Sequence, residues 1–594
     1  MLDYNAPLRD MRFVLNELIG FERIGQLNGC DEINQELSDA VLEEANKLAS
    51  DVLAPLNRVG DIEGSQLDGS VVTTPTGWKD AYGAFRDSGW CSLSMNPEYG
   101  GQGFPKVIAT AVAEMWDSSN MSFSLCPLLT NGAIEAVEQH GDALLKSLYL
   151  EKLVSGEWAG TMNLTEPQAG SDLSTVRTKA TPSGTHYLIQ GQKIYITYGE
   201  HDLTDNIIHL VLARTPDAPT GTKGISLFVV PKYLVNSDGS LGDRNDLRCI
   251  SLEHKLGIHA SPTAVMSYGD QGGAVGYLVG EENKGLMYMF TMMNAARHAV
   301  GREGMAIAEA SYQLAHKYAQ TRVQGNVTGD QENTNTIIGH PDVKRMLMLM
   351  KSQVEAMRAV NYLCAFEYDL AERHGDTDVR ALAERRGDLL TPIVKGWSTE
   401  IGQKLTSVGV QIHGGMGFVE ETGAAQYLRD SRITTIYEGT TGIQAADLVG
   451  RKTLRDGGKA VRELIADMKE TLNSMNVDDK SLQIIRDSFA QSVEDVEAVV
   501  DWLLANSNDP RLAAAAASSY LHLVGIACGG WLLARSAVLS AAQLSDGNTD
   551  TVFYAAKIDA ARFYATQVLP ETSGLRTAIV QGSETIADLG VSSF

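Results

Sequence analysis

The central part of the chain reads HYLIQGQKIYITYG (186–199), NIIHLVLART (206–215), KGISLFVVPKYL (223–234) and TAVMSYG (263–269). These runs are short and rich in β-branched and aromatic residues, and Gly, Pro, Asp and Asn separate them. That is the pattern of strands divided by turns. The sequence therefore predicts a β domain over residues 161–282.

Helical patterns lie on both sides of this β domain. Before it, Asp31–Arg58 places apolar residues at intervals of three and four, and Pro55 is expected to end or kink that helix. After it, 303–322 and 340–374 are long stretches rich in Ala, Leu and Met. We predict a multidomain α+β fold with four parts: a helical N-terminal domain (1–160), the central β domain (161–282), a C-terminal helical bundle (283–450) and an extra helical extension (451–594).

The extension contains a stretch without formal charge, Leu512 to Ala534, which is long enough to span a bilayer. Its alanines, its hydroxyl residues Ser518 and Ser519, and the pair Gly529-Gly530 favour instead a helix packed tightly inside a bundle. The flanking segments also lack the excess of Lys and Arg that accompanies membrane spans. We expect the extension to pack on its own chain or on a second copy, without membrane contact.

The composition excludes several classes of function. The chain has 49 Lys+Arg and 74 Asp+Glu, a net charge of −25, which argues against nucleic acid as a partner. The six cysteines lie far apart and form no CxxC pair, so we predict neither a metal site nor a dense disulfide framework. The opening MLDYNAPLRDMRF has no basic stretch followed by an apolar core, so we expect no secretory signal and a cytoplasmic protein.

Three segments contain residue types suited to a cofactor site. TMNLTEPQAGSD (161–172) combines small residues with hydroxyls that can hydrogen-bond a planar heterocycle and a phosphate, and KIYITYG (193–199) is a predicted strand. RDSRITTIYEGTTGIQ (429–444) places one carboxylate, Glu438, in an apolar and hydroxylic stretch. GxGxxG, Walker A, GxSxG and HExxH motifs do not occur. HGGMG (413–417) follows a helical pattern and by itself indicates a turn.

Taken together, these segments contain TEPxAGSD, K-x-[WY]-I-T, Q-x-x-GG-x-G and YEGT in that order, and the sequence resembles the acyl-CoA dehydrogenase family over about residues 60–450. The resemblance implies a helical N-terminal domain, a central β domain and a C-terminal helical bundle that bind FAD without a covalent bond. The opening and the extension look most like the long bacterial subgroup that includes 3-methylmercaptopropionyl-CoA dehydrogenases.

The reaction implied by the resemblance explains why a carboxylate is needed. Oxidation of an acyl-CoA to the trans-2-enoyl form removes a weakly acidic α-proton and transfers the β-hydrogen as hydride to the flavin. A base in a dry site must take that proton, and by the family motif the base is Glu438. Loss of water on substrate binding should raise its pKa.

The resemblance also implies the remaining site residues. It places flavin contacts at Met162, Leu164, Thr165, Ser171, Tyr195, Ile196, Thr197, Arg322, Gln324, Gln411, Gly414, Gly415, Thr440 and Gly442. It places substrate contacts at Ser171, Asn294, Arg297 and Gly439, and an internal ion pair is the alternative for Arg297. Arg322 and the 411–415 loop reach a neighbouring subunit's flavin in the family, so a homodimer or homotetramer is expected.

Several functions remain open from the sequence. The first is a dehydrogenase that passes electrons to an electron-transfer flavoprotein and acts on 3-(methylthio)propanoyl-CoA or on a medium- or long-chain fatty acyl-CoA. The others are an acyl-CoA oxidase and a non-catalytic, DNA-protective flavoprotein of the same fold. The presence of Glu438 and the acidic extension weigh against the last.

Overall fold

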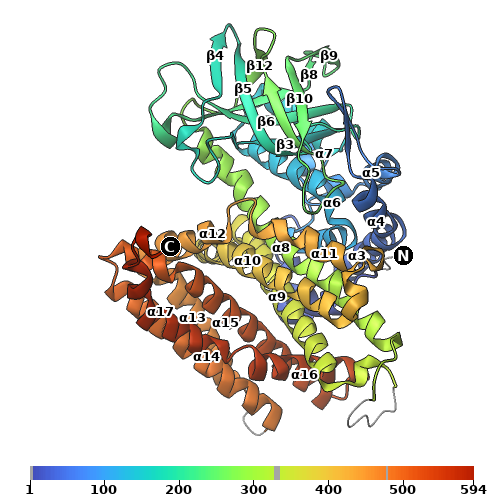
Figure 1. Ribbon diagram of the computed structural model, residues 1–594, viewed down its shortest axis with the longest axis vertical. Helices are drawn as coiled ribbons and strands as arrows, with labels where there is room; N and C mark the ends of the chain where they lie inside the picture. Colours follow the sequence, from blue (N-terminus) through green and yellow to red (C-terminus); the bar gives the residue numbers. More distant parts are fainter. Residues whose placement is uncertain (1–3, 327–334, 476–478) are drawn as a thin grey trace. The chain divides into compact units, whose positions relative to one another are not determined.

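The computed structural model describes residues 4–326, 335–475 and 479–594. Its contacts divide the chain into two compact units: a first unit of residues 1–5, 45–104 and 119–296, and a second unit of residues 6–44, 105–118 and 297–594. Three helices have residues in both units: α3 (Gln35–Leu48), α6 (Lys106–His140) and α8 (Gly285–Thr321) (Figure 1). α6 leaves helical geometry at Asn120 (φ −160°, ψ 84°). This residue lies directly after the boundary between the two units, which falls between residues 118 and 119. The four-part division at residues 160, 282 and 450 stays a prediction.

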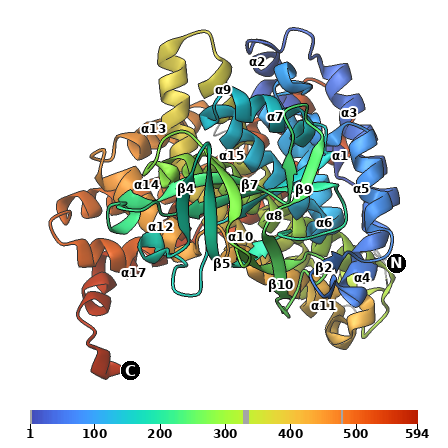
Figure 2. The ribbon, with the colours of Figure 1, turned by 90° about the horizontal axis from the view of Figure 1, so that it is seen from above.

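The first unit contains the predicted β domain as one eight-stranded sheet. The strand order is β10-β11-β5-β12-β7-β6-β3, with β4 paired to β5. Figure 2 shows β4, β5, β7 and β10 of this sheet. The strands are β3 (Trp158–Asn163), β4 (Lys179–Ser183), β5 (His186–Thr197), β6 (Asn206–Ala213), β7 (Ser226–Pro231), β10 (Leu247–Leu252), β11 (Thr263–Tyr268) and β12 (Ala274–Leu278). Neighbouring strands are antiparallel except β3 and β6, which run parallel. The four apolar runs are therefore β5, β6, β7 and β11, and the α+β fold is confirmed.

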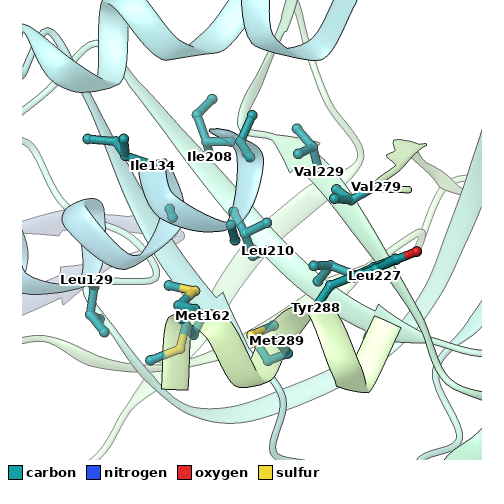
Figure 3. Close-up of a cluster of buried hydrophobic side chains, with 14 of the residues drawn as sticks. Leu129, Ile134, Met162, Ile208, Leu210, Leu227, Val229, Val279, Tyr288 and Met289 are labelled. Carbon is teal, nitrogen blue, oxygen red and sulfur yellow. The ribbon is translucent and has the colours of Figure 1, made fainter. Parts of the chain in front are cut away.

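The core of the first unit lies against β3, β6 and β7, whose residues are all buried. Burial on both faces explains their continuous apolar sequences, because no position faces water. Figure 3 shows Met162 of β3 close to Leu210 of β6 and Met289 of α8. The side chain of Met162 is thus part of the hydrophobic core.

The remaining elements of the first unit are α4 (Ala54–Glu63), α5 (Trp78–Asp87), α7 (Ala143–Val154) and the two-stranded sheets β1 (Gln66–Asp68) with β2 (Val71–Thr73) and β8 (Tyr233–Val235) with β9 (Leu241–Arg244). The helix does not end at Pro55, which is one of the two predicted outcomes, but its α-helical pattern is interrupted directly before that residue. The helical path continues from α3 through a π-helical turn, Ala49–Leu53, into α4. Pro55 lies in the first turn of α4, where a missing N–H breaks no helical hydrogen bond.

The second unit is helical. Its helices are α1 (Leu8–Arg12), α2 (Phe21–Gly25), α9 (Pro341–Arg373), α10 (Thr377–His413), α11 (Ala424–Ser431), α12 (Thr441–Val449), α13 (Lys459–Ser474), α14 (Lys480–Ala505), α15 (Pro510–Ser545), α16 (Thr551–Gln567) and α17 (Glu571–Ala587). α9 packs along α10, and α15 packs against α9, α10 and α12 as well as against α14, α16 and α17 (Figure 1). The extension therefore packs on its own chain, as one of the two predicted arrangements.

α15, which contains the uncharged stretch 512–534, is long and apolar enough to cross a membrane, but 83% of its most apolar part is buried inside the protein. Its glycines allow this close packing. A Cβ at Gly530 would come within 2.6 Å of the Leu569 side chain, and one at Gly529 within 2.6 Å of the Tyr564 hydroxyl. This is the buried bundle helix that the sequence predicts.

The two ends of the chain meet inside the second unit. Lys557 of α16 is buried and forms ion pairs with Asp10 of the N-terminal segment and with Glu355 of α9. Arg535 of α15 donates a hydrogen bond to the carbonyl oxygen of Leu18 at 2.9 Å. The first helices and the extension are thus one packed structure.

Candidate active site

Glu438 lies in a short loop between a 3₁₀ turn, Arg432–Thr435, and α12. Glu438 and Gly439 both adopt left-handed backbone geometry, with φ of 54° and 89°. This geometry is uncommon for a residue with a Cβ and persists only where neighbouring groups impose it. The loop therefore holds Glu438 in a strained position.

Side chains from α12 impose this geometry. Gln444 Nε2 donates a hydrogen bond to the carbonyl oxygen of Glu438 at 3.3 Å. A Cβ at position 439 would come within 2.8 Å of the same Nε2, so glycine is the residue that fits there. Thr440 caps α12 by accepting a hydrogen bond from the Ile443 N–H at 3.3 Å. The backbone on both sides of Glu438 is thus fixed.

Two further contacts fix the loop to neighbouring helices. The Tyr437 hydroxyl donates a hydrogen bond to Glu303 Oε2 on α8. On the other side, Thr441 Oγ1 donates to Glu400 Oε1 on α10 at 2.6 Å. The residues that flank Glu438 are therefore held by two different helices.

Glu303 is a buried carboxyl group that the sequence did not single out. Its Oε1 atom has no hydrogen-bond partner among the described residues. The adjacent Arg302 pairs with Asp117 of α6 instead, with 2.7 Å between Nε and Oδ2. Burial and the nearby Asp117 charge raise the pKa of Glu303 to about 8. An acidic group thus lies one hydrogen bond from the residue that precedes Glu438.

The side chain of Glu438 is half-buried and lies in the field of two cations. Burial raises the pKa of Glu438 above its ordinary value, although the charges of Arg297 and Lys395 oppose this shift. Arg297, on α8, is buried, and burial lowers the pKa of its guanidinium, while the charges of Asp447 of α12 and of Glu438 oppose this shift. The structure therefore brings Arg297 to the predicted base, while Asp447 keeps the internal ion pair open as its alternative role.

In the first unit, the TEPQAGSD and KIYIT segments are joined by a buried ion pair that sequence reasoning missed. Lys193 Nζ, with no exposed surface, donates to Glu166 Oε1 at 2.9 Å and to the carbonyl oxygen of Leu164 at 2.9 Å. Glu166 also accepts hydrogen bonds from Thr178 and from the Arg177 N–H. Burial alone would raise the pKa of Glu166, but the charge of Lys193 and the hydrogen bonds from Lys193, Thr178 and the Arg177 N–H lower it to about 2. A lysine inside an apolar strand was the available signal, because such a charge needs a partner.

Tyr195 projects from a β-bulge in β5. Met266 of β11 pairs with Lys193 and Ala264 with Ile196, so two residues of β5 oppose one of β11. Tyr195 takes a φ of 60°, and 60% of its side chain is exposed. Ile196 next to it is buried in the sheet core. The bulge thus presents the Tyr195 ring outward.

The other predicted flavin residues of this unit lie nearby along the chain. Leu164, Thr165 and Thr197 are half-buried and Ser171 is exposed. Ile194 N donates to the Thr165 carbonyl at 2.9 Å, and Thr161 Oγ1 donates to the Thr197 carbonyl at 2.7 Å. The structure therefore brings residues 162–165 and 195–197 together. Because Met162 and Ile196 are core side chains, only their main chain can meet a ligand.

The ends of α8 and α10 carry the residues expected to meet a neighbouring subunit. The Tyr318 ring of α8 lies 4.5 Å from the His413 ring of α10, so the two helix ends are adjacent. Those end regions carry Arg322, Gln324, Gln411, Gly414 and Gly415, which are all exposed. Phe418, just beyond, is 89% exposed.

Two predicted residues, Asn294 and Gly442, have simple environments. Asn294 is half-buried on α8, and Gly442 is exposed in the first turn of α12. A Cβ at Gly442 would meet nothing closer than Thr440 Oγ1 at 3.7 Å, so packing does not require glycine there. Among the described residues, no group of three or more His, Cys, Asp or Glu is placed to hold a metal ion.

Family models match most of the chain. The matches are to the acyl-CoA dehydrogenase N-terminal domain over residues 36–157, the middle domain over 161–270 and the C-terminal domain over 283–453. A model described as acetyl-CoA dehydrogenase C-terminal like matches residues 464–590.

Known proteins resemble the whole chain. It is 48% identical to 3-methylmercaptopropionyl-CoA dehydrogenase of Ruegeria pomeroyi, over 98% of this chain and 99% of that protein. It is 33% identical to a butyryl-CoA dehydrogenase of Syntrophomonas wolfei, over 100% of this chain and 99% of that protein. An acyl-CoA dehydrogenase of Bacillus anthracis, solved in complex with FAD, has the same fold, with a TM-score of 0.72, 19% identity, and coverage of 99% of this chain and 93% of that one. Three acyl-CoA dehydrogenase family models match residues between 36 and 453, and a 48% identical relative matches 98% of the chain. This chain therefore belongs to the acyl-CoA dehydrogenase family and is an oxidoreductase.

Proposed function

We propose that the protein is an FAD-dependent dehydrogenase that converts 3-(methylthio)propanoyl-CoA to its trans-2-enoyl thioester. The observation that carries the substrate is the 48% identity, over 98% of this chain, to the Ruegeria pomeroyi enzyme named for that substrate. A short straight-chain acyl-CoA is the second candidate, supported by the 33% identical butyryl-CoA dehydrogenase. In both cases the reaction removes the α-proton and the β-hydrogen and leaves a carbon–carbon double bond.

Glu438 is the base in this proposal. Its strained loop fixes the backbone of Glu438, which limits the directions from which the carboxylate can approach the α-proton. The carboxylate takes the α-proton while the electron pair of that C–H bond forms the double bond. When bound, FAD would supply the acceptor for the β-hydrogen and its electron pair. The cations Arg297 and Lys395 favour the ionised form of Glu438, which is the form that accepts a proton.

The residues of the first unit fit a planar cofactor. Tyr195 offers an exposed aromatic face at a rigid bulge, and the Glu166–Lys193 pair immobilises the backbone next to Leu164 and Thr165. We propose that Met162, Leu164, Thr165, Ser171, Tyr195, Ile196 and Thr197 of the first unit contact FAD, and that Ser171 and Asn294 of that unit contact the thioester. For the second unit we propose FAD contacts at Thr440 and Gly442 and thioester contacts at Arg297 and Gly439.

The exposed ends of α8 and α10 support an oligomer. We propose a homodimer or homotetramer in which Arg322, Gln324, Gln411, Gly414 and Gly415 reach the flavin of a second copy, with Phe418 at the interface. An electron-transfer flavoprotein is the proposed electron acceptor, and the cytoplasm the proposed location. Light scattering of the FAD-loaded protein tests the assembly, and a monomer that retains FAD would contradict it.

A panel of acyl-CoA thioesters tests the substrate. Anaerobic flavin reduction should have a higher kcat/KM with 3-(methylthio)propanoyl-CoA than with butyryl-, octanoyl- or palmitoyl-CoA. A preference for octanoyl- or palmitoyl-CoA would assign the protein to fatty-acid oxidation instead. Reoxidation of the reduced enzyme by air and by an electron-transfer flavoprotein then separates an oxidase from a dehydrogenase, and we expect the flavoprotein to be faster.

A further inference from the structure

Lys395 is a fully buried lysine near the middle of α10. Its Nζ atom has no hydrogen-bond partner among the described residues. A buried ammonium without a partner is costly in a folded protein, and such groups are usually paired. Its position therefore needs an explanation other than stability.

The geometry around Lys395 connects it to the Glu438 loop. Gly396, the next residue, packs against Gln444, since a Cβ there would lie 3.3 Å from the Gln444 Cβ. Gln444 in turn donates to the Glu438 carbonyl oxygen. One helical turn further along α10, Glu400 binds Thr441 at the other end of the same loop. This part of α10 thus forms the support on which the loop rests.

The charged groups that surround Lys395 are mostly acidic. Glu438, Glu303 of α8 and Glu400 of α10 favour its charged form, while burial and Arg297 of α8 oppose it, and its pKa falls to about 8. Asp117 of α6 acts on Glu303. Thr441 donates to Glu400, and Tyr437 donates to one oxygen of Glu303, Oε2. Of the three carboxylates, Glu438 has the largest influence on Lys395.

We propose that Lys395 is a positioning residue whose buried ammonium acts, together with Arg297, as a counter-charge of Glu438 and favours the ionised form of that base until it takes the α-proton. This inference rests on the proposed function, in which Glu438 is the base. It assigns Lys395 a role through Glu438 and not through contact with the substrate. When Glu438 accepts the proton, the ammonium loses its counter-charge, which favours return of the proton to solvent after the product leaves.

The test is the pH dependence of anaerobic flavin reduction in FAD-loaded Lys395→Met. Removing the cation should raise the pKa of Glu438. The rising limb of the plot of reduction rate against pH should therefore move to higher pH by about one unit, and below that limb the rate should be about tenfold lower than in wild type. The deficit should disappear above about pH 9, because wild-type Lys395 has itself lost its proton there. Lys395→Arg should restore the wild-type limb, since it restores the charge.

Lys404→Met is the matched control, because Lys404 is an exposed lysine on the same helix. It should leave the profile unchanged. Two results would overturn the inference. The rate of flavin reduction in Lys395→Met could be lower than in wild type by the same factor at every pH, or it could equal the wild-type rate. If Glu438→Gln reduces its flavin at a near-normal rate, the proposed base is wrong. If only Glu438→Gln is inactive and the limb of Lys395→Met does not move, the inference about Lys395 fails alone.

Thermal unfolding gives a readout that does not require turnover. Glu438→Gln should lower Tm at pH 7, because it leaves the Lys395 ammonium buried without its counter-charge. Adding Lys395→Met to that variant should raise Tm again, whereas the same change in the wild-type background should raise it less. Equal effects of Lys395→Met in the two backgrounds would contradict the proposed pairing.

Discussion

Two buried lysines, Lys193 in the first unit and Lys395 in the second, have the same exposure and opposite surroundings. Neither has exposed surface, and burial lowers the pKa of both to about 8. Lys193 Nζ contacts Glu166 and the Leu164 carbonyl at 2.9 Å, whereas Lys395 Nζ has no hydrogen bond among the described residues. The first lysine fixes a structure, and the second has its charge available to act on Glu438.

The comparison shows how buried charge is used in each unit. In the Glu166–Lys193 pair the carboxylate is surrounded by donors, so its pKa is far from neutral and it takes no part in proton transfer. Near Glu438, Glu303 Oε1 and Lys395 Nζ have no hydrogen bond among the described residues, and the pKa of the Glu303 carboxyl is raised to about 8, in contrast to that of Glu166. Groups that titrate near working pH are characteristic of functional sites.

The largest effect is expected from Glu438→Gln. The amide has nearly the same volume but cannot accept the α-proton, so flavin reduction should slow by up to about 10⁴-fold. Stopped-flow reduction measures this, and the flavin absorbance of the purified variant shows whether FAD binding persists. Near-normal reduction by this variant would place the base elsewhere.

Glu166→Gln should be the most destabilising change at the Lys193 pair. It leaves a fully buried ammonium without its carboxylate, which costs about 3–5 kcal/mol of unfolding free energy. Denaturant unfolding at pH 7 measures the loss. Because the pKa of Glu166 in the folded protein is about 2, below the ordinary value of 4.5 for a glutamate, its stabilisation is complete above pH 4.5 and is lost as the pH falls toward 2. The difference between wild type and Glu166→Gln should therefore shrink in acid, and a constant difference would contradict the pairing.

Tyr437→Phe should have a smaller effect. It removes the donor to Glu303 and leaves that buried carboxyl without its hydrogen bond, which costs about 1–3 kcal/mol. Flavin reduction should slow several-fold because the Glu438 loop loses one of its contacts. Glu303→Gln should affect the rate similarly, and the double variant should be less than additive. Additive losses would mean that the two residues act separately.

Glu497→Gln should have almost no effect and is the reference for Glu166→Gln. Lys469 and Glu497 are 2.8 Å apart, as close as the buried pair, but their side chains are 48% and 35% exposed. Water already solvates both charges, so the loss should be below about 1 kcal/mol. A loss as large as that of Glu166→Gln would show that burial does not explain the difference.

The sequence predicted the sheet and the base because both have local signals. The strands carry short β-branched runs, and the motif around Glu438 is contiguous. Lys395 and Glu303 carry no such signal, since they lie on long helices far from Glu438 in the chain and meet it only after folding. The bulge at Tyr195 arises from one extra residue in β5 relative to β11, which no pattern within β5 indicates. The partner of Lys193 depends on the same register.

The ion pair between Lys557 and Asp10 links residues 547 positions apart. A ribosome adds roughly 5–20 residues per second, so the N-terminal segment waits roughly half a minute to two minutes for α16 to be made. Until then Met11, Phe13 and Leu15, which are buried in the finished protein, have no partner from α16. Synthesis thus leaves the start of the chain dependent on its end, and a nascent chain that stops before α16 exposes an apolar segment to chaperones and proteases.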